Sequence, residues 1–180
     1  RATSPRASPS SNPRSPPRRS GAGFERRQVV GQFVRQVREA FAQVATQGCR
    51  ELFLSDPDFA DWPLGEMAVV ELLTRWAMSH RKLTVLALHY DEIVRRHPRW
   101  VAWRRQWSHV VECRAIDDIE PEALPTMLLA PGVVTVRLFD ARNHRASVST
   151  EVADAARARE DLDAVLQRSV DAFPASTLGL

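Results

Sequence analysis

The sequence predicts an α/β fold: a mixed sheet with parallel central strands, helices on both faces, and a C-terminal β-hairpin followed by a helix. Segments with a helical spacing of apolar residues alternate with short apolar runs that are typical of strands. The runs within 51–54 and 82–89 are nearly continuous, as expected for strands that are covered on both faces. Two later apolar runs flank Pro131-Gly132, a dipeptide that marks a turn.

The first half of the chain is expected to contribute two helices and two strands. Apolar residues at spacings of three and four predict a helix from Gln28 to Thr46, which Gly48 should end. A short strand at 24–30 is an alternative for the residues where this helix begins. The elements that follow are expected in alternation: a strand at 51–54, a helix at 65–78 and a strand at 82–89.

Prolines divide the second half. Pro98 interrupts a helical stretch from Asp91 to Trp107, and because proline is tolerated in a first helical turn, His97 is expected to cap a second helix. The remaining elements are a strand at 110–116, hairpin strands at 126–130 and 133–139, and a last helix that is marked by Leu162 to Phe173 and ends at Pro174.

Composition indicates a single globular domain, 23–180, behind a disordered tail rich in Arg, Pro and Ser, 1–22. The tail holds five arginines and no acid. Without them the chain has 20 basic residues against 22 acidic ones, so the body carries a net charge of −2 although the whole chain carries +3. Such a tail could attach weakly to nucleic acid or another polyanion, or it could serve as a solubilising linker.

Several classes of protein are disfavoured. No apolar stretch approaches the roughly 18 residues of a membrane span. Cys49 and Cys113 form neither a disulfide framework nor a zinc set, so we expect a reducing, cytoplasmic location. The histidines lack metal-ligand spacing. Glycine is scarce and no G-x-G-x-x-G or Walker loop occurs, which argues against dinucleotide and P-loop chemistry, and we predict no cofactor.

The first candidate site is an acidic loop. Asp56, Asp58 and Asp61 follow directly after a buried strand. Ligands of open α/β sheets usually bind beyond the carboxyl ends of strands, so these carboxylates could hold Mg²⁺, or one could attack a phosphate. An apolar strand that leads into Asp-x-Asp also begins haloacid-dehalogenase-type phosphatases, but Ala60 stands where that family has Thr or Val. The alternative is a turn, since Asp and Pro favour turns and helix caps.

The second candidate is an arginine-rich helix. Trp100, Trp103 and Trp107 share one helix face, and arginines lie between and around them. Aromatic and basic side chains in this arrangement can stack on bases and neutralise phosphates. The alternative is that the tryptophans belong to the core and the arginines to the solvated face. The candidate polyanion-binding residues are Arg95, Arg96, Arg99, Arg104 and Arg105.

Three stretches carry a family resemblance: 52–64 (LFLSDPDFADWPL), 107–114 (WSHVVECR) and 173–180 (FPASTLGL). With them the chain, from about Gln28 onward, resembles an uncharacterised bacterial family of small domains, each similar to one half of a phospholipase D-like fold. Active halves carry H-x-K-x-x-x-x-D before a hairpin turn. Here the resemblance places Leu124, Thr126 and Pro131 at the His, Lys and Asp positions, so it implies a copy without phosphodiesterase chemistry.

The leading functional hypothesis is therefore a non-catalytic phospholipase D-like module that binds a protein or nucleic-acid partner. Phospholipase D-like halves often pair, so the resemblance also implies a homodimer. The alternative is a metal-dependent phosphohydrolase that uses Asp56, Asp58 and Asp61. The two hypotheses differ in geometry: the enzyme needs three convergent carboxylates, whereas the binding module needs an exposed basic surface.

Overall fold

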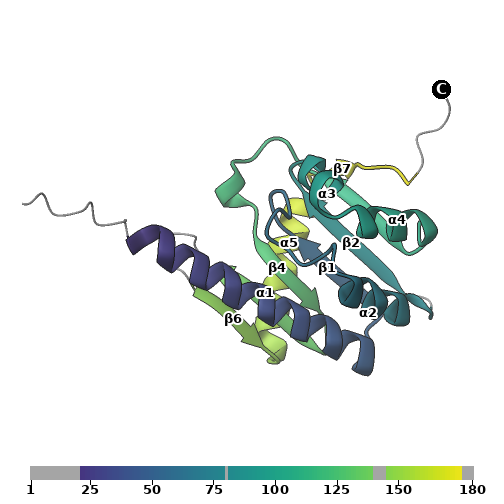
Figure 1. Ribbon diagram of the computed structural model, residues 1–180, viewed down its shortest axis with the longest axis horizontal. Helices are drawn as coiled ribbons and strands as arrows, with labels where there is room; N and C mark the ends of the chain where they lie inside the picture. The colour runs from purple at the N-terminus through teal and green to yellow at the C-terminus, as the bar shows by residue number, and fades with distance from the viewer. Residues whose placement is uncertain (1–20, 80, 140–144, 176–180) are drawn as a thin grey trace, which may run out of the picture.

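The computed structural model describes residues 21–79, 81–139 and 145–175, in which a seven-stranded sheet is covered by helices on both faces (Figure 1). The helices are α1 (Gly21–Gln47), α2 (Met67–Ala77), α3 (Asp91–Arg96), α4 (Pro98–Gln106) and α5 (Val152–Leu166), with a 3₁₀ turn at Pro121–Ala123. The strands are β1 (Glu51–Ser55), β2 (Lys82–Ala87), β3 (Val111–Ala115), β4 (Thr126–Ala130), β5 (Val134–Phe139), β6 (Arg145–Ser149) and β7 (Val170–Asp171).

The sheet is mixed, in the order β6-β5-β4-β1-β2-β3-β7. Its centre is parallel: β2 pairs with β1 on one side and β3 on the other. The other pairings are antiparallel: β4 adds to β1, β5 and β6 extend that side, and β7 closes the far edge against β3. The predicted mixed sheet with a parallel centre is confirmed.

The two faces of the sheet have separate cores. α1, α2 and α4 contribute Phe41, Trp76 and Trp100, which are at most 2% exposed, to one cluster. On the other face, α5 places Ala158 and Leu162 against apolar side chains of the sheet, among them Phe53. Figure 1 shows α5 behind the sheet and the other helices in front of it. Helices on both faces were predicted and are observed.

Two turns need glycine for a conformational reason. Gly132, in the β4–β5 hairpin, has a φ of +80°, and no atom outside its chain neighbours lies within 4 Å of an added Cβ. Gly48 has a φ of +74° and donates its N–H to the Val44 carbonyl oxygen at 2.9 Å, which ends α1 as predicted. L-residues rarely adopt this left-handed conformation, whereas glycine adopts it readily.

Some element boundaries differ from the sequence-based expectation. The strand considered at 24–30 is wrong, because these residues form the first turns of α1. The last helix begins at Val152 and ends at Leu166, so Phe173 lies beyond it. Strands β6 and β7 were not predicted. Of the tail predicted at 1–22, the structure describes only Gly21 and Ala22, which belong to α1, and the rest lies outside the described residues.

Two further findings concern the character of the helices and the state of the cysteines. Among the helices that the structure describes, none combines the length and apolar character that a membrane span requires. Cys49 and Cys113 are both free thiols, the first half-buried and the second buried.

Candidate functional site

Asp56 is the centre of the acidic loop, and its carboxylate is already used. One carboxylate oxygen accepts the N–H groups of Phe59 at 2.7 Å and Asp58 at 3.2 Å, and the other accepts the hydroxyl of Thr126 at 2.8 Å. Burial raises the pKa of Asp56, although these hydrogen bonds act in the opposite direction. The carboxyl group therefore organises a turn and joins it to the start of β4.

The rest of the loop is anchored in the core. Phe59 is fully buried with a φ of +58°, and its ring packs at a tilt against that of Trp62 at a centroid distance of 4.9 Å. His97 holds the loop from the other side: its Nε2 lies 2.8 Å from the Phe59 carbonyl oxygen, and its Nδ1 accepts the Gly65 N–H at 3.2 Å. An added Cβ on Gly65 would lie 3.1 Å from the His97 Cα, so glycine permits this close approach.

The three predicted metal-binding carboxylates are not brought together around a common centre. Asp58 accepts the N–H of Ala60 at 2.9 Å, and Asp61 is exposed. Within the described ranges, no group of three or more His, Cys, Asp or Glu side chains is arranged to hold a metal ion. The turn interpretation of this loop therefore accounts for its geometry, and the convergent carboxylates that the phosphohydrolase hypothesis requires are not observed.

The tryptophan stripe belongs to the core. Trp100 is fully buried and Trp103 is 3% exposed. The indole N–H of Trp103 donates to the Thr74 hydroxyl at 3.0 Å, which ties α4 to α2. Trp107 is half-buried, and its ring stacks on Trp103 at a centroid distance of 6.3 Å. A surface on which these indoles would stack with bases is thus not available, in agreement with the core interpretation.

The five predicted arginines have three different environments. Arg95 and Arg96 both form ion pairs with Glu92, at 2.6 Å each. Arg99 and Arg105 are exposed, and neither forms an ion pair with a carboxylate in the described part of the chain. Arg104 is buried, with only 6% exposed. The basic surface expected around these five arginines is therefore only partly formed: Arg104 is buried, and Glu92 neutralises part of the charge on α3.

Arg104 borders a cavity of about 170 Å³ between α3, α4 and the segment after β7. Its Nε and Nη1 groups have no hydrogen-bond partner within the described residues. The cavity is lined by Val94, Val101, Arg104, Arg105, Phe173, Pro174 and Ala175. The cavity therefore places a buried cation with unused donors beside apolar walls.

A larger hollow, of about 350 Å³, lies between the β4–β5 turn and the start of α5. Its lining includes Glu51 and Arg159. These two form an ion pair at 3.2 Å, and Arg159 also contacts Asp163 at 2.9 Å. Glu51 and Arg159 already neutralise each other, so this hollow is less suited to a charged ligand than the Arg104 cavity is.

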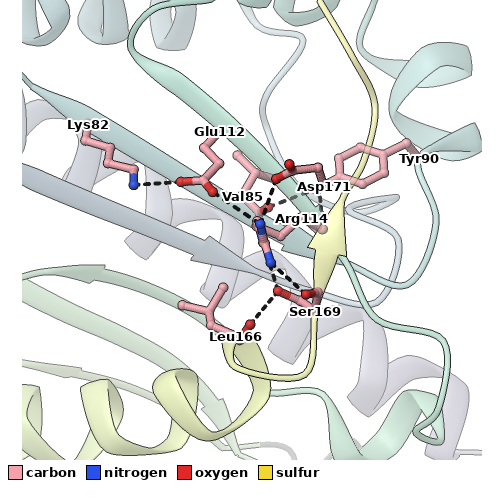
Figure 2. Close-up of polar contacts among 8 residues, drawn as sticks. All are labelled: Lys82, Val85, Tyr90, Glu112, Arg114, Leu166, Ser169 and Asp171. Atoms are coloured by element: carbon pink, nitrogen blue, oxygen red, sulfur yellow. Dashed lines mark hydrogen bonds and ion pairs between the residues drawn. The ribbon is translucent and has the colours of Figure 1, made fainter.

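The segment that carries the cavity wall is held by Arg114 (Figure 2). From β3 its guanidinium donates to the Ser169 hydroxyl at 2.9 Å, the Ser169 carbonyl oxygen at 2.6 Å and Asp171 at 2.7 Å. Beyond β7, the ring of Phe173 stacks parallel to Tyr90 at 5.0 Å. Strand β7 is only two residues long, so these contacts contribute much of its attachment.

Sequence reasoning missed the inward orientation of Arg104, although the signal was present. Arg104 follows Trp100 by four residues, a spacing that places both on one helix face. It also missed Arg114 and Phe173. Their contacts, with Ser169 and Tyr90, join segments more than fifty positions apart in the chain and leave no local pattern.

A family model covers residues 34–171, which is most of the chain, and its description is "Domain of unknown function (DUF7931)". The chain belongs to this family. The matched residues include the acidic loop, α3, α4 and β7, but the first half of α1 lies outside them. The expectation of an uncharacterised family is thereby confirmed, while the family description makes no reference to phospholipase D.

Among solved structures, the chain is similar to TrmBL2, an archaeal chromatin protein whose structure "shows a novel mode of DNA binding". The TM-score is 0.52 at 15% sequence identity, and the match covers 79% of this chain. The match covers 51% of the TrmBL2 chain, so the present chain spans about half the length of that protein. At this identity the similarity concerns the fold. No curated protein matches the sequence.

Proposed function

We propose that this domain is a non-catalytic, phospholipase D-like binding module. The positions that the resemblance assigns to the catalytic His and Lys are occupied by groups with structural roles. Leu124 is 3% exposed within the core on the α5 face, and the hydroxyl of Thr126 donates to Asp56. Leu124 has no lone pair with which to attack phosphorus, and Thr126 has no charge with which to hold a phosphoryl group, which supports a role in binding over a role in hydrolysis.

Nucleic acid is the partner that we propose first. The observation that carries this proposal is the charge of segment 91–106, where four exposed arginines and two acids give the surface a net +2 on a body of net −2. Arg99 and Arg105 extend this charge to the surface. Phosphate contacts by arginine supply most of sequence-independent affinity for DNA. The shared fold with a DNA-binding chromatin protein is compatible with this function.

The metal-dependent phosphohydrolase has less support. It requires several carboxylates that share one cation, whereas Asp56 and Asp58 accept backbone N–H groups of their own loop. We retain a cytoplasmic location and a homodimer as parts of the proposal, the first because both thiols are free and the second by analogy with paired phospholipase D-like halves.

The test is binding of a labelled duplex and a labelled single strand to the full chain, followed by fluorescence anisotropy between about 50 and 200 mM salt. We expect affinity to fall steeply with salt. Arg99→Gln with Arg105→Gln should lower the slope of log affinity against log salt by about one for each arginine removed. Arg157→Gln is the matched control, because Arg157 is exposed on α5, on the opposite face of the sheet.

An absence of binding at the lower salt would refute nucleic acid as the partner. The double variant removes two charges and the Arg157 control one, so a loss in the control about half as large as that in the double variant would show that binding depends on total charge and does not use the α3–α4 surface.

A further inference from the structure

The cavity at Arg104 contains a charge that the described residues do not neutralise. Arginine stays protonated in proteins, and burying an unpaired cation costs several kcal/mol. No carboxylate within the described ranges forms an ion pair with Arg104, and its Nε and Nη1 donors are unused. A polar side chain that is nine-tenths buried and has two unused donor nitrogens needs a partner, and the adjacent cavity is where a partner can enter.

The ionisable neighbours of Arg104 do not supply this partner. Cys113 and Tyr90 both interact with the guanidinium, but burial raises the pKa of each. The thiol and the phenol therefore stay protonated at neutral pH and bring no negative charge. The Tyr90 hydroxyl is also occupied, since it lies 2.7 Å from the Arg114 carbonyl oxygen and can donate to it.

The remaining walls restrict the chemistry of the ligand. Val94, Val101, Phe173 and Pro174 are apolar, and Arg105 is the other charged residue of the lining. A volume of about 170 Å³ is close to that of a cavity that accepts benzene, about 150 Å³. A fully hydrated inorganic ion gains nothing from apolar walls, whereas an anion on a small apolar stem gains from both parts of the cavity.

The cavity wall also shows local strain. Phe173 is a non-glycine residue with a φ of +45°, a left-handed conformation that is unfavourable for residues with a Cβ. Its ring is nevertheless held parallel to Tyr90, and the segment before it is bound by Arg114. Strained residues of this kind concentrate at ligand sites, because the surrounding contacts fix them in place.

We infer that the Arg104 cavity binds a carboxylate group carried on a small apolar stem, with Arg104 and Arg105 as its cationic partners. The carboxylate could belong to a free organic acid or to the C-terminal residue of a peptide, since both present the same chemistry. This inference goes beyond nucleic-acid binding: the two sites share Arg105, but Arg104 belongs to the cavity alone.

The experiment measures thermal stability of the full chain with isovalerate or benzoate, each compared with its neutral amide, and with inorganic phosphate. Because a ligand that binds only the folded state raises its stability, the acids should raise Tm and the amides should not. An N-acetylated dipeptide that ends in leucine separates the two sources: a larger shift than isovalerate assigns the site to a peptide terminus, and a smaller one to a free acid.

Two variants make the test specific. Arg104→Met should weaken acid binding by about tenfold to a hundredfold, the loss expected for hydrogen bonds to a charged group. It should also raise the Tm of the free protein, because an unpaired buried cation is replaced by a hydrophobic side chain of similar length. A purely structural arginine would have the opposite effect on Tm. Arg157→Gln, on the far face, should bind the acids as the unmodified protein does.

Three results would overturn the inference: acids without effect on the unmodified protein, equal shifts with acids and amides, or full binding by Arg104→Met. A shift by inorganic phosphate as large as that by the acids, lost in Arg104→Met, would likewise reject the carboxylate and identify a site for inorganic anions.

Discussion

At the scale of single residues, Asp56 shows how a residue type suited to catalysis can serve structure. A carboxylate directly after a buried strand is what metal-dependent phosphate chemistry uses, and the sequence predicted that possibility. Its actual partners are two backbone N–H groups and one hydroxyl. Thr126 lies 70 positions away in the chain, so no local pattern could have indicated this contact.

The first residue-scale prediction compares two substitutions of Asp56. Asparagine keeps an oxygen for the N–H groups of Phe59 and Asp58, and its amide can donate to Thr126, so Asp56→Asn should keep the stability of the protein at neutral pH or raise it. Alanine leaves buried donors without a partner, so Asp56→Ala should lower the free energy of unfolding by about 1–3 kcal/mol. Urea denaturation measures both.

The pH dependence follows from the raised pKa of Asp56. Because the folded state prefers the protonated carboxyl, the stabilising contribution is complete below the ordinary value of 3.8 and is lost as pH rises through the raised folded pKa. The stability of the unmodified protein relative to Asp56→Asn should therefore fall over that window and then level off. A relative gain in stability as pH rises would show that the fold prefers the charged form.

At the scale of elements, what the sequence predicted depended on how local each signal is. Long amphipathic helices and apolar strands were predicted because their pattern lies within one segment. The polar edge strand β6 has a single large apolar residue, Val148, and no such pattern. The last helix was placed too late because Val170 and Phe173 continue the helical spacing from Leu162, although the chain has already left the helix at Leu166.

The attachment of β7 gives the element-scale prediction. Arg114→Met removes three hydrogen bonds that hold Ser169 and Asp171 against β3. We expect local detachment: the amide of Ala172, which donates to the Cys113 carbonyl oxygen at 3.0 Å, should exchange about tenfold faster or more, while amides shared by β2 and β3 keep their protection. Hydrogen exchange followed by NMR resolves these sites.

The matched control for this clamp is Asp171→Asn. The Asp171 side chain is 87% exposed, so its ion pair should contribute less than about 1 kcal/mol, and Ala172 should retain most of its protection. If Arg114→Met and Asp171→Asn accelerated exchange equally, the two contacts to Ser169 would have no role in holding the strand.

At the scale of the whole molecule, charge is divided unevenly between two parts of the chain. The fold class could be predicted because alternation of helices and strands is a global property of the sequence. The division of charge also follows directly from the sequence. The burial of Arg104 does not, because it depends on how α4 packs. Composition therefore favours a polyanionic partner as a hypothesis, but it could not predict which arginines would be exposed.

The last prediction concerns the five arginines at positions 1–19, which account for the difference between a net charge of +3 and one of −2. If they contact a nucleic acid, replacing all five with glutamine should lower the slope of log affinity against log salt by about four, since each phosphate contact contributes about 0.7–0.9. Anisotropy titrations of the full-length variant at several salt concentrations give this slope. The fold should be unaffected, which circular dichroism checks. An unchanged slope would limit binding to the α3–α4 surface, and a slope near zero would show that the tail supplies all of the contacts.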